Sequence, residues 1–155
     1  MKYYSTNKQA PYASLEEAVV KGLASDKGLY MPEYIKPIDK EIISDLKNKS
    51  FHEIACIVAQ AFFGADIEAE TLNEIVTDTL AFETPVVNVH DNLYSLELLH
   101  GPTLAFKDVG ARFMARLLGY FIKKEGLKQV NVLVATSGDT GSAVANGFLG
   151  VPGIH

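Results

Sequence analysis

The chain has 155 residues, a formal net charge of −5 and a pI near 5.3. This acidic balance argues against a nucleic-acid-binding or anionic-membrane surface, because both need clustered cations. The one loose basic cluster, Lys123, Lys124 and Lys128, is interpreted as the polar end of a helix, where the helix dipole favours cations. With 48% hydrophobic and 21% charged residues, the composition is that of an ordinary globular protein.

The N-terminus lacks the apolar stretch of a secretory signal, and the apolar run 54–63 is too short to cross a bilayer. We therefore expect a cytoplasmic protein. Cys56 is the only cysteine, and the histidines do not have the spacing of metal ligands. We expect no metal site.

Residues 1–84 are predicted to form a mainly helical N-terminal region. Ser14 with Glu17 three positions later is typical of a capping box, and Ser50 can cap the apolar run that follows it. The expected helical blocks are 14–24, 40–63 with a break near 48–50, and 67–80.

Residues 85–155 are predicted to begin an α/β domain. The pattern indicates strands at 86–89 and 93–99 separated by a turn at Asp91–Asn92, a helix after Lys107, a strand at 129–135 and a helix that includes 143–148. The run 129–135 is almost continuously apolar, as a parallel sheet covered on both faces requires. By default this order predicts a right-handed βαβ unit. The expected fold is therefore a small helical layer followed by the start of a helix-covered, largely parallel sheet.

Lys107 is the first candidate site residue. It follows the apolar run Leu104–Phe106 and precedes Asp108, which we interpret as a helix-starting residue. Partial burial would favour the neutral, nucleophilic amine, and a helix N-terminus would attract anions. Such a lysine suits Schiff-base chemistry, although a structural lysine extending from a helix start is the alternative.

The second candidate is the loop at 136–141. It follows the expected strand and turns through Ser137, Gly138, Asp139, Thr140 and Gly141 into a helix. Glycines let the backbone approach an anion, the first helical N–H groups point outward, and the hydroxyls add donors. The loop is neither a P-loop nor a dinucleotide fingerprint. The alternative is that Asp139 or Thr140 merely caps the helix.

The segments LELLHGPTLAFKD and ATSGDTG together resemble threonine synthase, a family of pyridoxal-phosphate enzymes with the tryptophan-synthase-β-like fold (fold type II). The N-terminal YYSTN and SDKGLYMPEYI are similar to the start of the same enzymes. Members run to several hundred residues, so the resemblance implies an N-terminal fragment that is inactive alone. The implied reaction converts O-phospho-L-homoserine and water to L-threonine and phosphate.

The resemblance also implies roles for single residues. Lys107 would bind pyridoxal phosphate covalently and move protons between substrate carbons. Residues Ser137, Gly138, Asp139, Thr140 and Gly141 would hold the substrate carboxylate, with Asp139 near the phenolic oxygen of the cofactor. We expect backbone N–H groups or a proton to neutralise Asp139. The loop for the cofactor phosphate and the partner of its pyridine nitrogen are expected beyond residue 155.

Other functions stay open at this point. His100 could move a proton, but a turn-stabilising hydrogen bond is favoured beside Gly101 and Pro102. Another pyridoxal-phosphate lyase of the same fold could act on serine, threonine or a phosphorylated analogue. A non-catalytic small-molecule binding module is the alternative from another class. No pattern in the sequence predicts an oligomeric state.

Overall fold

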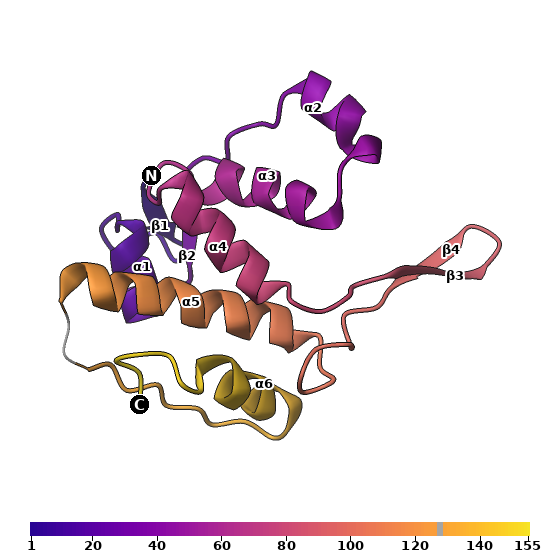
Figure 1. Cartoon of the computed structure of the whole chain (residues 1–155). Coiled ribbons are helices and arrows are strands. Elements are labelled where there is room, and N and C mark those ends of the chain that lie inside the picture. The colour runs from indigo at the N-terminus through magenta and orange to yellow at the C-terminus, as the bar shows by residue number, and fades with distance from the viewer. Residues whose placement is uncertain (127–128) are drawn as a thin grey trace. The chain divides into compact units, whose positions relative to one another are not determined.

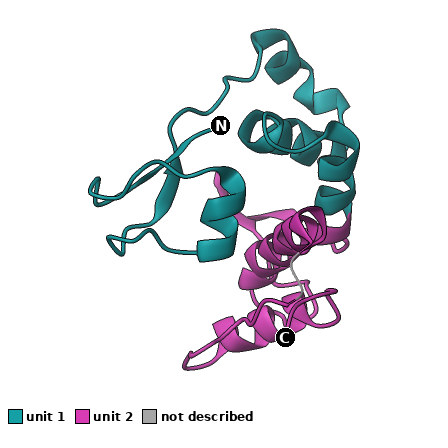
Figure 2. Cartoon of the chain, turned by 90° about the vertical axis from the view of Figure 1, so that its left-hand side faces the viewer, with its two compact units in different colours: residues 1–77 teal, residues 78–155 magenta. Residues whose placement is uncertain are grey.

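The computed structural model describes residues 1–126 and 129–155, so Lys128 of the basic cluster lies outside the described residues. The chain divides into two compact units, residues 1–77 and residues 78–155 (Figure 2). The domain boundary expected at 84/85 stays a prediction. Along the described ranges, no helix is long and apolar enough to cross a membrane.

The expected helical blocks of the N-terminal region are confirmed. They form α1 (Leu15–Lys21), α2 (Lys40–Asp45) with the 3₁₀ turn η1 (Leu46–Asn48), α3 (Phe51–Phe63) and α4 (Ala69–Thr79). Ser50 and Glu53 complete a reciprocal capping box on α3. At α1 only half of the expected box forms, because the Glu17 carboxylate pairs with Lys21 while the Ser14 hydroxyl accepts from the Glu17 N–H.

A small sheet in this unit was missed by the sequence analysis. Strands β1 (Tyr3–Ser5) and β2 (Tyr30–Pro32) pair antiparallel, with Tyr4 opposite Met31. Three-residue strands are too short to show a period of two, and their partners are distant in sequence. The pairing is therefore visible only in the tertiary structure.

Asp26 ties the loops beside this sheet together. Its carboxylate accepts from the Ser5 hydroxyl at 2.6 Å and from the main-chain N–H groups of Gln9, Ala10 and Gly28 at 2.9–3.0 Å. These hydrogen bonds, the one from Ser5 first, stabilise the ionised form and lower the pKa of Asp26 to about 2.

The second unit begins with a two-stranded ribbon. Strands β3 (Val86–His90) and β4 (Leu93–Leu96) form an antiparallel hairpin around the expected turn (Figure 1). The second strand ends at Leu96 and not at the expected residue 99. All residues of both strands are exposed, so the ribbon has no buried face in the described residues.

Two helices form the core of the second unit. Helix α5 (Lys107–Glu125) packs against α6 (Asp139–Phe148), as Figure 1 shows. The buried face of α5 consists of Asp108, Ala111, Ala115, Leu117, Leu118, Phe121 and Ile122. The helices approach so closely that a Cβ at Gly147 would lie 3.0 Å from the carbonyl carbon of Ala111. A side chain there would force α6 away from α5.

The prediction of a strand at 129–135 is wrong in detail. The segment is extended but makes one isolated parallel bridge, between Val130 and Ile154, and the Leu133 side chain is 94% exposed. A buried parallel strand needs paired neighbours on both sides. Among the described residues only 153–155 hydrogen-bond to this segment, so the expected βαβ unit does not form here.

Candidate active site

Lys107 is the first residue of α5, as expected from the sequence. The residue is half-buried, and its Nζ lies 4.3 Å from the centroid of the Phe106 ring. Phe106 is the N-cap residue, and no side chain caps this helix end. Asp108 is therefore not a cap. It sits in the first turn, where its carboxylate accepts hydrogen bonds from Thr103.

The loop at 136–141 leads into α6 as expected. Gly138 is the N-cap residue, and no side chain makes a cap hydrogen bond. The alternative in which Asp139 or Thr140 serves as the cap is therefore wrong. Residues Ser137, Gly138, Asp139 and Thr140 are exposed, and Gly141 is half-buried. The Gly138 N–H donates to Thr136 Oγ1 at 3.4 Å and the Gly141 N–H to the Gly138 carbonyl at 2.9 Å. Among the described residues this leaves the N–H groups of Asp139 and Thr140 for an anion.

Asp139 is exposed in the first turn of α6. Within the described ranges its carboxylate receives no hydrogen bond, so the expected neutralisation by backbone N–H groups is not observed. A carboxylate at a helix N-terminus still gains from the helix dipole.

One pocket brings the two candidate segments together. It has a volume of about 780 Å³, and both Lys107 and Thr140 line it. The rest of the wall is mostly apolar and consists of Leu98, Phe106, Val109, Gly110, Ala111, Met114, Val132, Leu133, Val134, Ala135, Val144 and Phe148. Of the five loop residues only Thr140 reaches this wall. An amine and a hydroxyl in an otherwise apolar pocket can hold a small molecule with an aromatic ring and polar ends.

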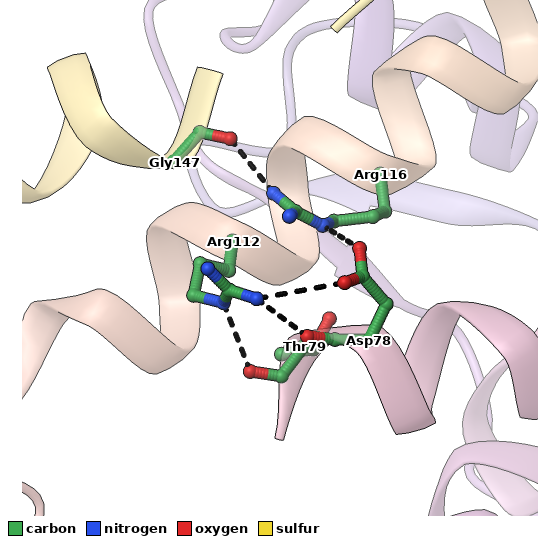
Figure 3. A network of polar contacts seen from close by, with 5 residues as sticks. All are labelled: Asp78, Thr79, Arg112, Arg116 and Gly147. Atoms are coloured by element: carbon green, nitrogen blue, oxygen red, sulfur yellow. Dashed lines mark hydrogen bonds and ion pairs between the residues drawn. The ribbon is translucent and has the colours of Figure 1, made fainter. Parts of the chain in front are cut away.

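A network of arginines fixes the two helices that carry these groups (Figure 3). The Arg116 guanidinium donates from Nη1 to the Gly147 carbonyl of α6 at 2.8 Å and from Nε to the Asp78 carboxylate at 2.5 Å. Arg112 donates to the main-chain carbonyls of Asp78 and Thr79 at 2.6 and 3.1 Å. The sequence analysis did not identify these contacts, because each arginine binds residues more than thirty positions away and no local pattern indicates such partners.

The other polar candidates take no part in this pocket. His100 pairs through Nε2 with Glu97 Oε2 at 2.8 Å, which confirms the hydrogen-bonded role favoured from the sequence. In the part of the chain that the structure describes, no group of three or more His, Cys, Asp or Glu residues could hold a metal ion.

The chain is similar in sequence to known threonine synthases. Residues 2–80 match the family model described as "Threonine synthase N terminus". The chain is 40% identical over 154 residues to threonine synthase of Escherichia coli (strain K12), a match that covers 99% of this chain and 35% of that protein. It is 37% identical to threonine synthase of Haemophilus influenzae over 100% of this chain and 35% of that protein.

Solved structures of threonine synthases are also similar to this chain. A crystal structure of pyridoxal-phosphate-bound threonine synthase from Brucella melitensis superposes with a TM-score of 0.91 at 38% identity, over 99% of this chain and 34% of that one. Yeast threonine synthase gives a TM-score of 0.87 at 37% identity, with coverage of 99% and 34%. This chain thus spans about a third of the length of the relatives that it matches.

Fold and pocket together define an α/β protein of the fold type II pyridoxal-phosphate enzyme class. Within that class, the chain belongs to the threonine synthase N-terminus family.

Proposed function

We propose that this chain supplies the amine and the carboxylate-binding loop of a threonine synthase. The enzyme would convert O-phospho-L-homoserine and water to L-threonine and phosphate. The observation that carries the proposal is that Lys107 and Thr140, from segments more than thirty residues apart, line one pocket. Residues 1–84 would form the helical N-terminal domain, and residues 85–155 the first part of the cofactor domain.

The residues of the pocket fit pyridoxal phosphate. The amine of Lys107 can hold the cofactor covalently, and the aromatic and aliphatic wall suits a flat ring. When bound, the cofactor supplies an electron sink for carbanions at the substrate carbons. Groups for its phosphate and its pyridine nitrogen would come from residues outside this chain.

Lys107 would also move protons. Its amine would take a proton from one substrate carbon and return it to another, because Lys107 lies at the first position of α5 and lines the pocket. Because the amine and the substrate would be held in one pocket, proton transfer between them would not require a collision in solution.

The loop Ser137–Gly141 would hold the substrate carboxylate. The uncapped N–H groups of α6 and the Thr140 hydroxyl supply donors, and the helix dipole adds attraction for an anion. Asp139 would lie near the phenolic oxygen of the cofactor. Its carboxylate is exposed, so a substrate carboxylate bound beside it would require that Asp139 turn away or gain a hydrogen-bond donor.

The test replaces Lys107 with Ala in the complete protein. We expect loss of the borohydride-reducible link to pyridoxal phosphate and of nearly all turnover, because covalent holding and proton transfer both need the amine. The matched control is Lys123→Ala, an exposed lysine of the same helix. A reducible link at another lysine of the variant would show that this assignment is wrong.

The same assay separates the alternatives. Release of phosphate and threonine from O-phosphohomoserine supports the proposed reaction, whereas turnover of serine or threonine alone would favour another lyase of the fold. A stable link without turnover of any of these would favour the binding module. A cytoplasmic location stays a prediction from sequence.

A further inference from the structure

The loop before Lys107 closes on a buried carboxylate. The main-chain N–H of Thr103 donates to Asp108 Oδ2 at 2.9 Å, and the Thr103 hydroxyl donates to Asp108 Oδ1 at 2.6 Å. One threonine thus binds both oxygens of one carboxylate. Asp108 is 0% exposed, and a Cβ at Gly101 would lie 2.5 Å from its Oδ2. The loop therefore packs directly against this carboxylate.

Apolar burial contributes little to the shape of this loop, because the small side chain of Ala105 is its one buried apolar group among the described residues. Leu104 and Phe106 are 75% and 63% exposed, so their side chains contribute little packing within the described residues. Leu104 also has a φ of 56°, in the left-handed region that residues other than glycine rarely occupy. Such a conformation persists only where the surroundings impose it. Main-chain hydrogen bonds from Leu104 to Gly101 and from Asp108 to Ala105 form short turns within the loop. The Thr103–Asp108 hydrogen bonds are the side-chain contacts that join residues 103 and 108 across it.

Burying a carboxylate is unfavourable unless donors compensate it. Here the two donors of Thr103 and the N-terminus of α5 stabilise the charge. An apolar residue at this position would fill the space without that cost. The carboxylate therefore matters for its geometry. Asp108 directly follows Lys107, and its two oxygens hold Thr103 on the other side of the loop.

We propose that Asp108 and Thr103 are positioning residues for Lys107. The hydrogen bonds between them close residues 103–108 into a ring that contains Lys107. The ring fixes the position of the Lys107 Cα and so the direction in which its side chain extends. The inference rests on the proposed function, in which that amine holds the cofactor and transfers protons. It predicts a defect in the step that uses the amine and none in binding of the substrate carboxylate, which other residues perform.

The decisive variants, made in the complete protein, are Thr103→Val and Thr103→Ser. Valine keeps the shape and the main-chain donor but removes the hydroxyl, whereas serine keeps both donors. The matched control is Thr84→Val, because the Thr84 hydroxyl is buried and has no hydrogen-bond partner among the residues that the structure describes. Asp108→Asn is a stronger change that can prevent folding, and the Thr103 pair decides the question if it does.

Two readouts are needed. In the protein without cofactor, amide hydrogen exchange at residues 103–106 should become roughly tenfold faster in Thr103→Val, as loss of one hydrogen bond to a charged group predicts. With cofactor, the rate of forming the reducible link and kcat should fall roughly tenfold, with KM within twofold of wild type. Thr103→Ser and Thr84→Val should stay within twofold in all measurements.

Three outcomes would overturn the inference. In the first, amide hydrogen exchange at residues 103–106 of Thr103→Val equals that of the wild type. In the second, exchange is faster but the rate of link formation and kcat are normal. In the third, Thr103→Val loses no more activity than Thr84→Val does. Failure of the proposed function looks different. In that case the wild-type protein would form no link at Lys107, while the exchange rates would still report whether the ring of hydrogen bonds exists.

Discussion

The two segments that line the pocket reach their positions by different means. The segment 101–107 is closed by a buried aspartate, and its shape is defined by hydrogen bonds within a few residues. The segment 136–141 has an exposed aspartate, and the side-chain hydrogen bond described within it runs from the Gly138 N–H to Thr136 Oγ1 at 3.4 Å. Its position depends on α6, which packs on α5 through Gly147 and is held by Arg116.

This difference suits the two proposed tasks. An amine that must meet a reacting carbon needs a preorganised backbone. A loop that closes around a carboxylate can stay open until the anion supplies the missing partner. If this distinction holds, substitutions in the two segments and in the contacts that support them should have different effects.

Thr140→Val tests the open segment. We expect kcat/KM to fall roughly tenfold to a hundredfold, because a hydrogen bond to a charged group contributes about 1.5–3 kcal/mol. The spectrum of the bound cofactor without substrate should be unchanged. Steady-state release of phosphate and threonine measures kcat/KM, and absorbance spectroscopy measures the spectrum of the bound cofactor.

The control for this variant is Asn146→Ala, an exposed position on the same helix. Wild-type kinetics in Thr140→Val would mean that the hydroxyl does not contact substrate. Loss of cofactor instead would move this loop from substrate recognition to cofactor binding.

Arg116→Met tests the distant support. It removes the bonds to the Gly147 carbonyl and to Asp78, and we expect the free energy of unfolding to drop by about 1–2 kcal/mol, since Asp78 is partly exposed. KM should rise more than kcat falls, because α6 carries the carboxylate loop. Chemical denaturation and steady-state kinetics measure the two effects. If Arg116→Met were as stable as Lys123→Met, the network would not support α6.

Asp26→Asn tests whether an aspartate closes loops in the first unit as one does in the second. The folded pKa of Asp26, about 2, lies below its ordinary value of 3.8, so its stabilisation is present above pH 4 and is lost as the pH falls towards 2. Denaturation midpoints should differ most between wild type and variant at neutral pH and converge near pH 2. A difference that is constant with pH would contradict this role.

Thr79→Val should have the smallest effect. The Thr79 side chain is 2% exposed, and within residues 1–126 and 129–155 its hydroxyl has no hydrogen-bond partner, while its carbonyl accepts from Arg112. Removing the hydroxyl should leave the free energy of unfolding unchanged or raise it by up to about 1 kcal/mol. Thermal unfolding measures this. A marked loss of stability would reveal a partner for the hydroxyl.

Local patterns in the sequence were sufficient for most helices. Ser14 and Ser50 are signals that act within one turn of the chain, because a capping side chain contacts only nearby N–H groups, and both serines accept from a main-chain N–H three residues later. The same is true of the turn at Asp91–Asn92. The candidate residues Lys107 and Ser137–Gly141 were also found from the sequence, by their motifs and their position at helix starts, and their roles stay predictions.

The pairing of distant segments became visible only in the folded structure. That structure brought Tyr3 beside Ala13 and Pro32, joined Arg116 to Gly147, and turned Asp108 from an expected helix start into the anchor of a loop. It also left 129–135 extended without a regular strand. Strand pairing and buried polar contacts depend on groups distant in sequence, and no periodicity within one segment encodes which partner will satisfy them.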